Sequence, residues 1–164
     1  MKIDVRLGGP DDVEPALSIY ELSNLARRRG DWPSRQARLQ HVAANLRDPS
    51  SWFVIAHDAA EAVAMASVLP FRSDDGAGPP VPHTVFLDLI YVLPERWGEG
   101  IGGVVLDAVI DEAKRRGMRR IHLWTHEDDN ERAHRLYRSR GFAPTARTTL
   151  DDRGQAAREW LLEM

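Results

Sequence analysis

The sequence predicts one domain of mixed α/β (α+β) architecture over residues 1–164. Two hydrophobic patterns support this fold class. Apolar and polar residues alternate in short segments, as in half-buried strands, and apolar residues recur three or four positions apart in longer segments, as in amphipathic helices. The predicted order is strand, two helices, three strands, helix, strand, helix and two strands, which is expected of a sheet flanked by helices.

The N-terminal third is predicted to form a strand and two helices. Residues 2–7 (KIDVRL) alternate in polarity as a strand does. We expect a helix over residues 8–30, where Pro10 suits the first helical position. A second helix is predicted over residues 33–49, because apolar side chains keep a helical spacing until Pro49.

The middle of the chain is predicted to contain three strands. Residues 51–57 and 61–71 are apolar and rich in strand-forming side chains, and the short polar turn between them indicates a hairpin. Residues 72–82 have the glycine and proline content of a loop. The third strand is expected over residues 83–94.

The C-terminal part is predicted to form a helix, a strand, a second helix and a hairpin. The first helix has apolar side chains at helical spacing, namely Leu106, Val109, Ile110 and Ala113. A strand is expected over residues 119–126 and a short helix over residues 127–142, with Asp128 or Asp129 available as its cap. Residues 145–164 are expected to form a hairpin that turns at DDRG.

Composition excludes several classes of function. The chain has no cysteine, which excludes disulfides, thiolate catalysis and cysteine-ligated zinc. Its formal net charge of −3 differs from the basic bias of nucleic-acid-binding proteins. No apolar run approaches the roughly 20 residues of a membrane span, and the first residues lack the apolar stretch of a secretory signal. We therefore expect a cytoplasmic protein with no nucleic-acid or membrane partner.

Four glycines lie close together in residues 94–106 (PERWGEGIGGVVL), just before a predicted helix. Such spacing at Gly98, Gly100, Gly102 and Gly103 indicates a backbone that approaches a ligand closely or adopts unusual dihedral angles. The helix that follows offers unpaired N–H groups and the positive end of its dipole. Together these features predict a phosphate-binding site.

A dinucleotide-binding fingerprint is one interpretation, because Gly98, Gly100 and Gly103 satisfy G-x-G-x-x-G. Three observations count against it. The residues PERW separate the glycines from the strand, and only one unit of helix and strand follows. A ribose-binding acid is expected about 20 residues further on, and Glu127 lies beyond that.

A longer pattern resembles the GNAT N-acetyltransferase superfamily. Its first part is a strand, then V-x-P, then x-x-G-x-G at Gly100 and Gly102, then a helix. Its second part, N-x-x-A-x-x-L-Y-x-x-x-G-F, is present as Asn130, Ala133, Leu136, Tyr137, Gly141 and Phe142. The resemblance implies the GNAT acyl-CoA N-acyltransferase fold, with a mixed, mostly antiparallel central sheet flanked by helices.

The first part departs from the family pattern at one position. The family usually has Arg or Gln three residues before its first glycine, whereas this chain has Trp97, with Arg96 beside it. A cradle built from backbone N–H groups does not require that side chain. We expect the cradle to be retained and Arg96 to replace part of the missing charge.

The resemblance implies acetyl-coenzyme A (acetyl-CoA) as the acyl donor, an amine as acceptor, and no metal. Its pyrophosphate would lie on the N–H groups of residues 97–102, and Gly100 and Gly102 would be required because a Cβ would block the approach or the dihedral angles. The preceding strand would pair its backbone with the pantetheine arm. The implied donor site consists of Ile90, Tyr91, Val92, Trp97, Gly98, Glu99, Gly100, Ile101, Gly102, Asn130, Ala133 and Tyr137.

The resemblance also implies two proton-transfer residues. Tyr137 would protonate the leaving thiolate, because a phenol with a pKa of about 10 carries its proton at neutral pH. The alternative is a tyrosine that only packs in the core. Asp88, the acidic residue of strand 83–94, is the candidate base, and Glu127 and Asp128 are alternatives.

His122 and His126 have the i, i+4 spacing that binds a metal on a helix. Their segment is predicted to be a strand, in which the two residues lie about 13 Å apart. We therefore expect structural roles for both.

The resemblance implies direct attack of a primary amine on the thioester, without a covalent enzyme intermediate. The loop at residues 72–82 and the first two helices would border the acceptor site, and a homodimer is consistent with the family. The alternative is a module that binds or senses an acyl-CoA without catalysis. The sequence does not specify the acceptor.

Overall fold

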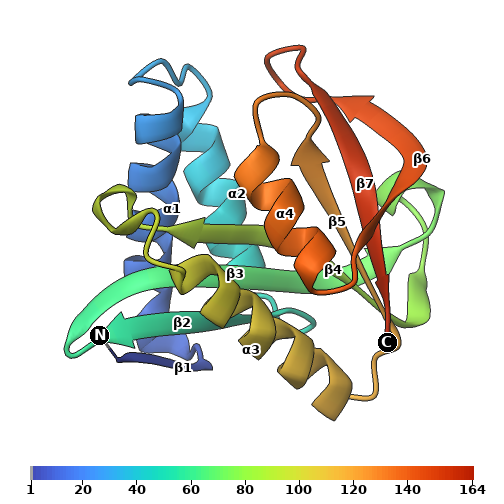
Figure 1. The fold of residues 1–164 in the computed structure, drawn as a ribbon, viewed down its shortest axis with the longest axis horizontal. Coiled ribbons are helices and arrows are strands. Elements are labelled where there is room, and N and C mark those ends of the chain that lie inside the picture. Colours follow the sequence, from blue (N-terminus) through green and yellow to red (C-terminus); the bar gives the residue numbers. More distant parts are fainter. Residues whose placement is uncertain (1) are drawn as a thin grey trace. The chain divides into compact units, whose positions relative to one another are not determined.

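A computed structural model describes residues 2–164, and its elements follow the predicted order (Figure 1). The strands are β1 (Ile3–Leu7), β2 (Trp52–Asp58), β3 (Glu61–Arg72), β4 (Pro80–Val92), β5 (Arg120–His126), β6 (Ala143–Leu150) and β7 (Ala156–Glu163). The helices are α1 (Val13–Arg27), α2 (Arg35–Arg47), α3 (Ile101–Arg115) and α4 (Glu131–Ser139). None of these helices has both the length and the apolar character needed to cross a bilayer.

The strands form one sheet in the order β1-β2-β3-β4-β5-β7-β6. Strands β4 and β5 pair in parallel, whereas β1 with β2, β2 with β3, β5 with β7 and β6 with β7 pair antiparallel. The predicted mixed, mostly antiparallel sheet is therefore confirmed. Both predicted hairpins, β2–β3 and β6–β7, are present as well.

Several predicted element ends differ from the structure. The predicted first helix begins with a 3-10 turn at Pro10–Asp12, and α1 itself starts at Val13. Strand β4 starts at Pro80 and not at residue 83, because proline is tolerated in extended backbone at the start of a strand. The cap of α4 is Asn130 and not an aspartate.

The chain divides into two compact units, which we describe separately. The first unit comprises residues 2–69 and 89–111, and the second comprises residues 70–88 and 112–164. In the first unit, β1, β2 and most of β3 form an antiparallel ladder, and α1 and α2 lie side by side (Figure 1). Its core includes fully buried side chains of Ile55, Met65, Val42, Val63 and Val105.

In the second unit, β7 lies between β5 and β6, and α4 packs against β7 (Figure 1). The contact is aromatic: the ring of Trp160 stacks on His134, with 5.1 Å between ring centroids, and lies 6.1 Å from the ring of Tyr137. Burial alternates along β5, where Ile121, Leu123 and Thr125 are buried and the residues between them are half-buried. One face of this strand therefore belongs to the core, and the other carries more polar side chains.

An ion pair holds the start of α1 to β1 in the first unit. Both guanidinium nitrogens of the Arg6 fork donate to the carboxylate of Asp12, at 2.6 and 2.7 Å, and the Gly9 N–H donates to it at 2.8 Å. The hydrogen bonds from Arg6 outweigh the effect of burial and, with Gly9, lower the pKa of Asp12 from 3.8 to about 2. Because the folded pKa lies below the unfolded one, the ionised form stabilises the fold above pH 4 or so, and this stabilisation is lost as the pH falls towards 2.

We predict that Asp12→Asn lowers the free energy of unfolding at pH 7 by about 1–2 kcal/mol. The difference from the wild type should shrink as the pH falls from about 4 to about 2, since the wild-type carboxylate becomes protonated there. Urea denaturation at several pH values measures both effects. Asp11→Asn, at the exposed neighbouring position, is the control and should change stability by less than about 0.5 kcal/mol. A pH-independent difference for Asp12→Asn would contradict the prediction.

Candidate functional site

The C-terminal end of β4 is held in place by hydrogen bonds within the first unit. The carbonyl oxygen of Val92 accepts from Ser23 Oγ at 3.0 Å and from Trp97 Nε1 at 2.8 Å. The next N–H, of Leu93, donates to the carbonyl of Val63 at 2.9 Å. These bonds fix the strand end from which the glycine-rich turn departs.

The turn after β4 contains two glycines with a left-handed backbone. A 3-10 turn at Pro94–Arg96 leads to Gly98 and Gly100, whose φ angles are +87° and +81°. Side chains other than glycine rarely adopt such angles, so both positions require glycine. Gly102 lies within α3 and is not among the positive-φ glycines, so its dihedral angles do not require glycine, and a close approach of the ligand stays the predicted reason for it.

Helix α3 begins directly after Gly100 and leaves backbone N–H groups available. Its first hydrogen bond runs from the Val104 N–H to the Gly100 carbonyl at 3.4 Å, so the N–H groups of residues 101–103 have no partner inside the helix. A Cβ at Gly100 would meet no atom within 4 Å, which shows open space beside the turn. Free N–H groups, the positive helix end and open space together fit a phosphate group.

The departure at Trp97 has a structural explanation. Its indole N–H donates to the Val92 carbonyl, while 45% of the residue's surface stays exposed. An Arg or Gln side chain at this position would place a polar terminus beside the cradle, whereas Trp97 uses its single donor to join the turn to β4. The Trp97 side chain therefore offers no further donor to a ligand at the turn.

Arg96 forms hydrogen bonds and ion pairs with carboxylates of its own unit. It donates to Asp58 at 2.7 Å and to Glu99 at 3.0 Å, and it lies 3.8 Å from Glu61. The hydrogen bond to Glu99, followed by that to Asp58, raises the pKa of Arg96 above its ordinary value. Because these carboxylates already balance the guanidinium charge, the structure does not support our expectation that Arg96 replaces a cradle cation.

In the second unit, the parallel ladder of β4 and β5 ends immediately before Asp88. The paired residues run from Thr84 with Arg120 to Leu87 with Leu123, although both strands continue beyond the last pair. Asp88 is half-buried and, by strand alternation, lies on the same face as Phe86, the partner of His122. The predicted base thus lies where the two strands stop pairing.

A cluster of side chains surrounds the buried Glu159 in the same unit, and sequence reasoning missed it. We define the Glu159 cluster as Phe71, His122, Arg147 and Glu159. The Glu159 carboxylate is only 3% exposed and accepts from Arg147 at 2.8 Å. His122 Nδ1 lies 3.2 Å from Glu159 Oε2 without the alignment of a hydrogen bond, and the imidazole stacks on Phe71 with centroids 3.8 Å apart.

Burial lowers the pKa of His122 below its ordinary value, against the opposing effect of Glu159. The imidazole is therefore neutral at pH 7. Arg147 also donates to Asp75 at 2.5 Å and lies over the ring of Trp124, 5.6 Å from its centroid. The cluster thus links β3, β5, β6 and β7 through charge and ring stacking.

His126 joins the end of β5 to the β6–β7 turn. Its Nε2 lies 2.9 Å from the Asp151 carboxylate, and its carbonyl accepts from His134 Nε2 at 2.8 Å and from the Asn130 amide at 3.2 Å. The Asn130 amide also donates to Thr125 Oγ1 at 2.6 Å, so its side chain does not cap α4. Among residues 2–164, no group of three or more histidines and carboxylates is arranged to hold a metal ion.

Tyr137 lies on α4, in the same helix as Ala133, and its ring is packed in the core of the second unit. The residue is 7% exposed, and its ring lies 5.8 Å from that of Phe142 and 6.1 Å from that of Trp160. Aromatic packing therefore fixes the direction of the phenol. Tyr91 is similarly held in the first unit by an edge contact with Tyr20, with centroids 5.3 Å apart.

The predicted site residues fall into two groups. The first unit brings together the end of β4 and the glycine turn, namely Ile90, Tyr91, Val92, Trp97, Gly98, Glu99, Gly100, Ile101 and Gly102. The second unit contains Asp88 at the end of the parallel ladder, and Asn130, Ala133 and Tyr137 in α4 and at its cap.

Comparison with known proteins identifies a family model, two curated relatives and solved structures to which this chain is similar. Residues 16–142 match the model of the Acetyltransferase (GNAT) family. A mycothiol acetyltransferase of Jonesia denitrificans is 27% identical over 121 residues, which cover 71% of this chain and 37% of that protein. The chain spans about a third of the length of the curated relatives it matches.

Two solved structures show the same fold. The ribosomal-protein-S18-alanine N-acetyltransferase of Escherichia coli has a TM-score of 0.74 at 20% identity, covering 99% of this chain and 94% of that one. The PaiA N-acetyltransferase of Thermoplasma acidophilum, solved with coenzyme A, has a TM-score of 0.68 at 16% identity over the full length of both chains.

We predict that Glu159→Gln lowers the free energy of unfolding by about 2 kcal/mol, because it removes the buried partner of Arg147. The expected loss is smaller than for a fully buried pair, since the Arg147 side chain is 43% exposed. Urea denaturation measures this loss in the free energy of unfolding, because urea is uncharged and does not screen the ion pair as a salt would. Glu163→Gln, on the same strand but exposed, is the matched control and should change stability by less than about 0.5 kcal/mol. Equal losses in the two variants would contradict a special role for Glu159.

Proposed function

The chain belongs to the Acetyltransferase (GNAT) family, and on this premise we propose that it transfers an acetyl group from acetyl-CoA to a primary amine. The observation that carries the proposal is the glycine turn. Gly98 and Gly100 adopt left-handed backbone angles immediately before the free N–H groups of α3. This is the arrangement that a pyrophosphate requires.

We propose that the donor is bound mainly by the backbone. The N–H groups of residues 98–102 would hold the pyrophosphate, since the Trp97 N–H already donates to the Pro94 carbonyl at 3.2 Å. The backbone of Ile90–Val92 would pair with the pantetheine arm as an added strand does. The two hydrogen bonds to the Val92 carbonyl keep the strand end ordered before a ligand arrives and use both lone pairs of that oxygen, so the pairing would use other polar groups of Ile90–Val92. Asn130 and Ala133 are proposed as further donor contacts on family grounds.

The proposed reaction is direct acyl transfer. The amine nitrogen forms a bond to the acetyl carbon, the carbon–sulfur bond breaks, and coenzyme A leaves as the thiol. Asp88 is proposed to take the proton that the amine loses, and Tyr137 to give a proton to the departing sulfur. The enzyme would orient both reactants and stabilise the developing oxyanion with a strand N–H. The absence of cysteine is consistent with transfer that forms no cysteine thioester.

The packing of Tyr137 supports its proposed role. Phe142 and Trp160 hold the ring of Tyr137, so its hydroxyl is oriented without loss of side-chain freedom during the reaction. Asp88 is placed at the end of the β4–β5 ladder, where strand pairing no longer occupies the neighbouring backbone. Glu127 is a weaker candidate base, because its carboxylate is bound by Arg158.

The acceptor class stays a proposal. A primary amine is the acceptor that the family name suggests, and mycothiol-related amines belong in any screen because two relatives carry the mycothiol acetyltransferase name. A homodimer, a cytoplasmic location and the lack of nucleic-acid or membrane partners stay predictions from the sequence.

We predict that acetyl-CoA and coenzyme A, but not NAD, stabilise the protein against heat. At about 100 times the dissociation constant, either ligand should raise Tm by about 5–10 °C. Gly100→Ala should lose most of this shift, because an alanine at φ +81° disfavours the cradle backbone.

Gly154→Ala is the matched control for the cradle variant. Gly154 has a φ of +77° and, like Gly100, open space around its Cβ position, but it lies in the β6–β7 turn. Both variants should therefore lose similar intrinsic stability, while only Gly100→Ala weakens the coenzyme A shift. Equal ligand shifts in the two variants would show that the glycine turn does not bind the donor.

Tyr137→Phe distinguishes an enzyme from a module that only binds acyl-CoA. We predict a fall in kcat of about 100-fold or more, with an unchanged acetyl-CoA-dependent Tm shift. Release of coenzyme A can be followed with a thiol reagent, and the cysteine-free chain adds no background. Gly154→Ala, in the β6–β7 turn, is the control and should keep its turnover. Unchanged turnover in Tyr137→Phe would remove this residue from the mechanism, and no turnover of any amine by the wild type would favour the binding module.

A further inference from the structure

His126 and Asp151 form a pair of imidazole and carboxylate at one end of the second unit. The turn between β6 and β7 lies beside the C-terminal end of β5, where the Glu127 N–H donates to the Ala156 carbonyl at 3.0 Å (Figure 1). His126 Nε2 lies 2.9 Å from the Asp151 carboxylate. A carboxylate only accepts hydrogen bonds, so Nε2 carries the hydrogen and Nδ1 the lone pair of the neutral ring. The imidazole is thus oriented as a carboxylate orients a histidine that takes up a proton.

The Asp151 carboxylate is held in place and stays ionised. Its other oxygen accepts from the N–H groups of Arg153 and Gln155, both at 2.8 Å. Burial raises the pKa of Asp151, but these bonds and the one from His126 outweigh it, so that the pKa lies below its ordinary value. The carboxylate therefore keeps its negative charge at neutral pH, where it can stabilise a positively charged imidazole.

His126 lies on the face of the sheet that carries the proposed base. Leu87 and Leu123 are the last pair of the parallel ladder, so Asp88 and Trp124 follow at the same level and lie on the opposite face from that pair. Alternation along β5 places His126 next to Trp124 on the face of Asp88. The His126 side chain is 33% exposed, which allows it to exchange a proton with water.

The other titratable groups around His126 are less suited to exchange protons with water. His134 is buried, and its Nε2 donates to the His126 carbonyl. His122 Nδ1 is buried and has no hydrogen-bond partner among residues 2–164. The neighbouring Glu127 carboxylate is bound by Arg158. His126 is therefore the imidazole of this face that combines an ionised partner with access to water.

The nitrogen of a primary amine loses two protons during acetyl transfer. An alkylammonium group has a pKa of about 10, so the acceptor arrives charged at neutral pH and must lose one proton before it can attack. It loses the second when the carbon–nitrogen bond forms and the carbon–sulfur bond breaks. Asp88 takes this second proton, Tyr137 protonates the sulfur, and the proton on Asp88 then restores the Tyr137 hydroxyl. The first proton is left over and must pass to water.

We propose that His126, oriented by Asp151, takes the first proton from the ammonium group of the acceptor and releases it to water. This inference rests on the proposed acetyl transfer and adds a second proton acceptor to it. His126 is then a catalytic residue, because its Nδ1 contacts the acceptor nitrogen, and Asp151 is a positioning residue. An imidazole suits this step better than a carboxylate such as Asp88, since its ordinary pKa of about 6.5 is closer to that of an ammonium group.

Two probe acceptors of nearly the same size test this role. Ethylamine is an ammonium ion at about pH 8. Methoxyamine is uncharged there and has no proton to lose before it attacks. Release of coenzyme A from acetyl-CoA is followed with a thiol reagent, after subtraction of the reaction without enzyme. For an enzyme that accepts only larger amines, the larger amine and its alkoxyamine analogue replace the two probes.

His126→Gln retains a nitrogen that can donate to Asp151 but cannot take up a proton. It should lower kcat/KM for ethylamine by about 30-fold or more, and that for methoxyamine by less than about 3-fold. Asp151→Asn retains an oxygen for the N–H groups of the turn and removes the charge. It should lower kcat/KM for ethylamine by about 10-fold and spare methoxyamine in the same way. A merely structural role would lower both rates alike.

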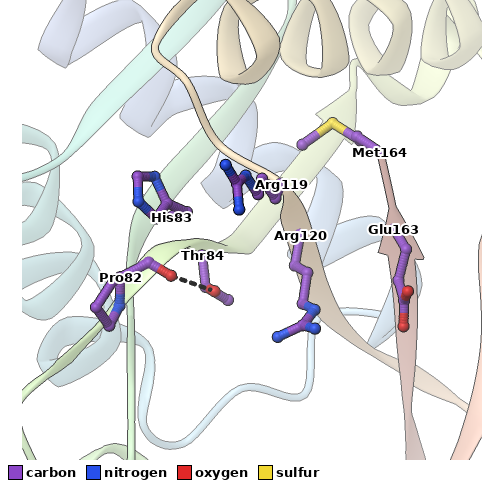
Figure 2. A pocket seen from close by; sticks show the side chains of 7 residues that line it. All are labelled: Pro82, His83, Thr84, Arg119, Arg120, Glu163 and Met164. Atoms are coloured by element: carbon purple, nitrogen blue, oxygen red, sulfur yellow. Dashed lines mark hydrogen bonds between the residues drawn. The ribbon is translucent and has the colours of Figure 1, made fainter.

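His83→Gln is the matched control. His83 belongs to the same unit but lies at the start of β4, beside the cavity shown in Figure 2, with its Nδ1 3.2 Å from the Gly117 carbonyl. This variant should keep both rates within about twofold of the wild type. An unchanged Tm shift with coenzyme A would show that each variant folds and binds the donor.

Equal losses with the two probes in His126→Gln, or no loss with either, would overturn the role of His126. The proposed function would then stand, because the wild type still acetylates the probes. If the wild type releases coenzyme A with no primary amine, the proposed function fails and the role of His126 fails with it.

Discussion

The carbonyl group of Val92 is the point on which the proposed donor site depends. It accepts hydrogen bonds from Ser23 in α1 and from Trp97 in the turn, so one oxygen connects a helix, the end of β4 and the glycine segment. A strand that ends in open space would fray, and the turn after it would not hold its left-handed glycines in one arrangement. Because this oxygen accepts both hydrogen bonds, the N–H groups of the turn and of the start of α3 keep the orientation proposed for binding a ligand.

Ion pairs hold neighbouring strands and turns together. Arg96 and Arg147 each contact two or more carboxylates.

Some of the candidate site could be predicted from the sequence because its signals are local. The glycine run, the helix after it and the motif from Asn130 to Phe142 each lie within a few consecutive residues. The Glu159 cluster gave no comparable signal. Glu159 meets Arg147 across a hairpin whose register shifts between Pro144 and Thr148, and it approaches His122 from a neighbouring strand. A residue spacing cannot reveal contacts that depend on a bulge and on strand order.

The sequence by itself determined the order of elements, the mixed sheet architecture, the family and the glycine turn proposed for the donor, because periodicity, turn residues and close glycines act over short distances. Tertiary structure decided which glycines have a positive φ, that the Trp97 indole donates to the Val92 carbonyl, and that carboxylates bind the Arg96 guanidinium. It also decided that Asn130 turns its amide towards β5 instead of capping its helix. These outcomes depend on which polar groups meet after the strands have paired, since each buried donor or acceptor takes the partner that the fold brings near.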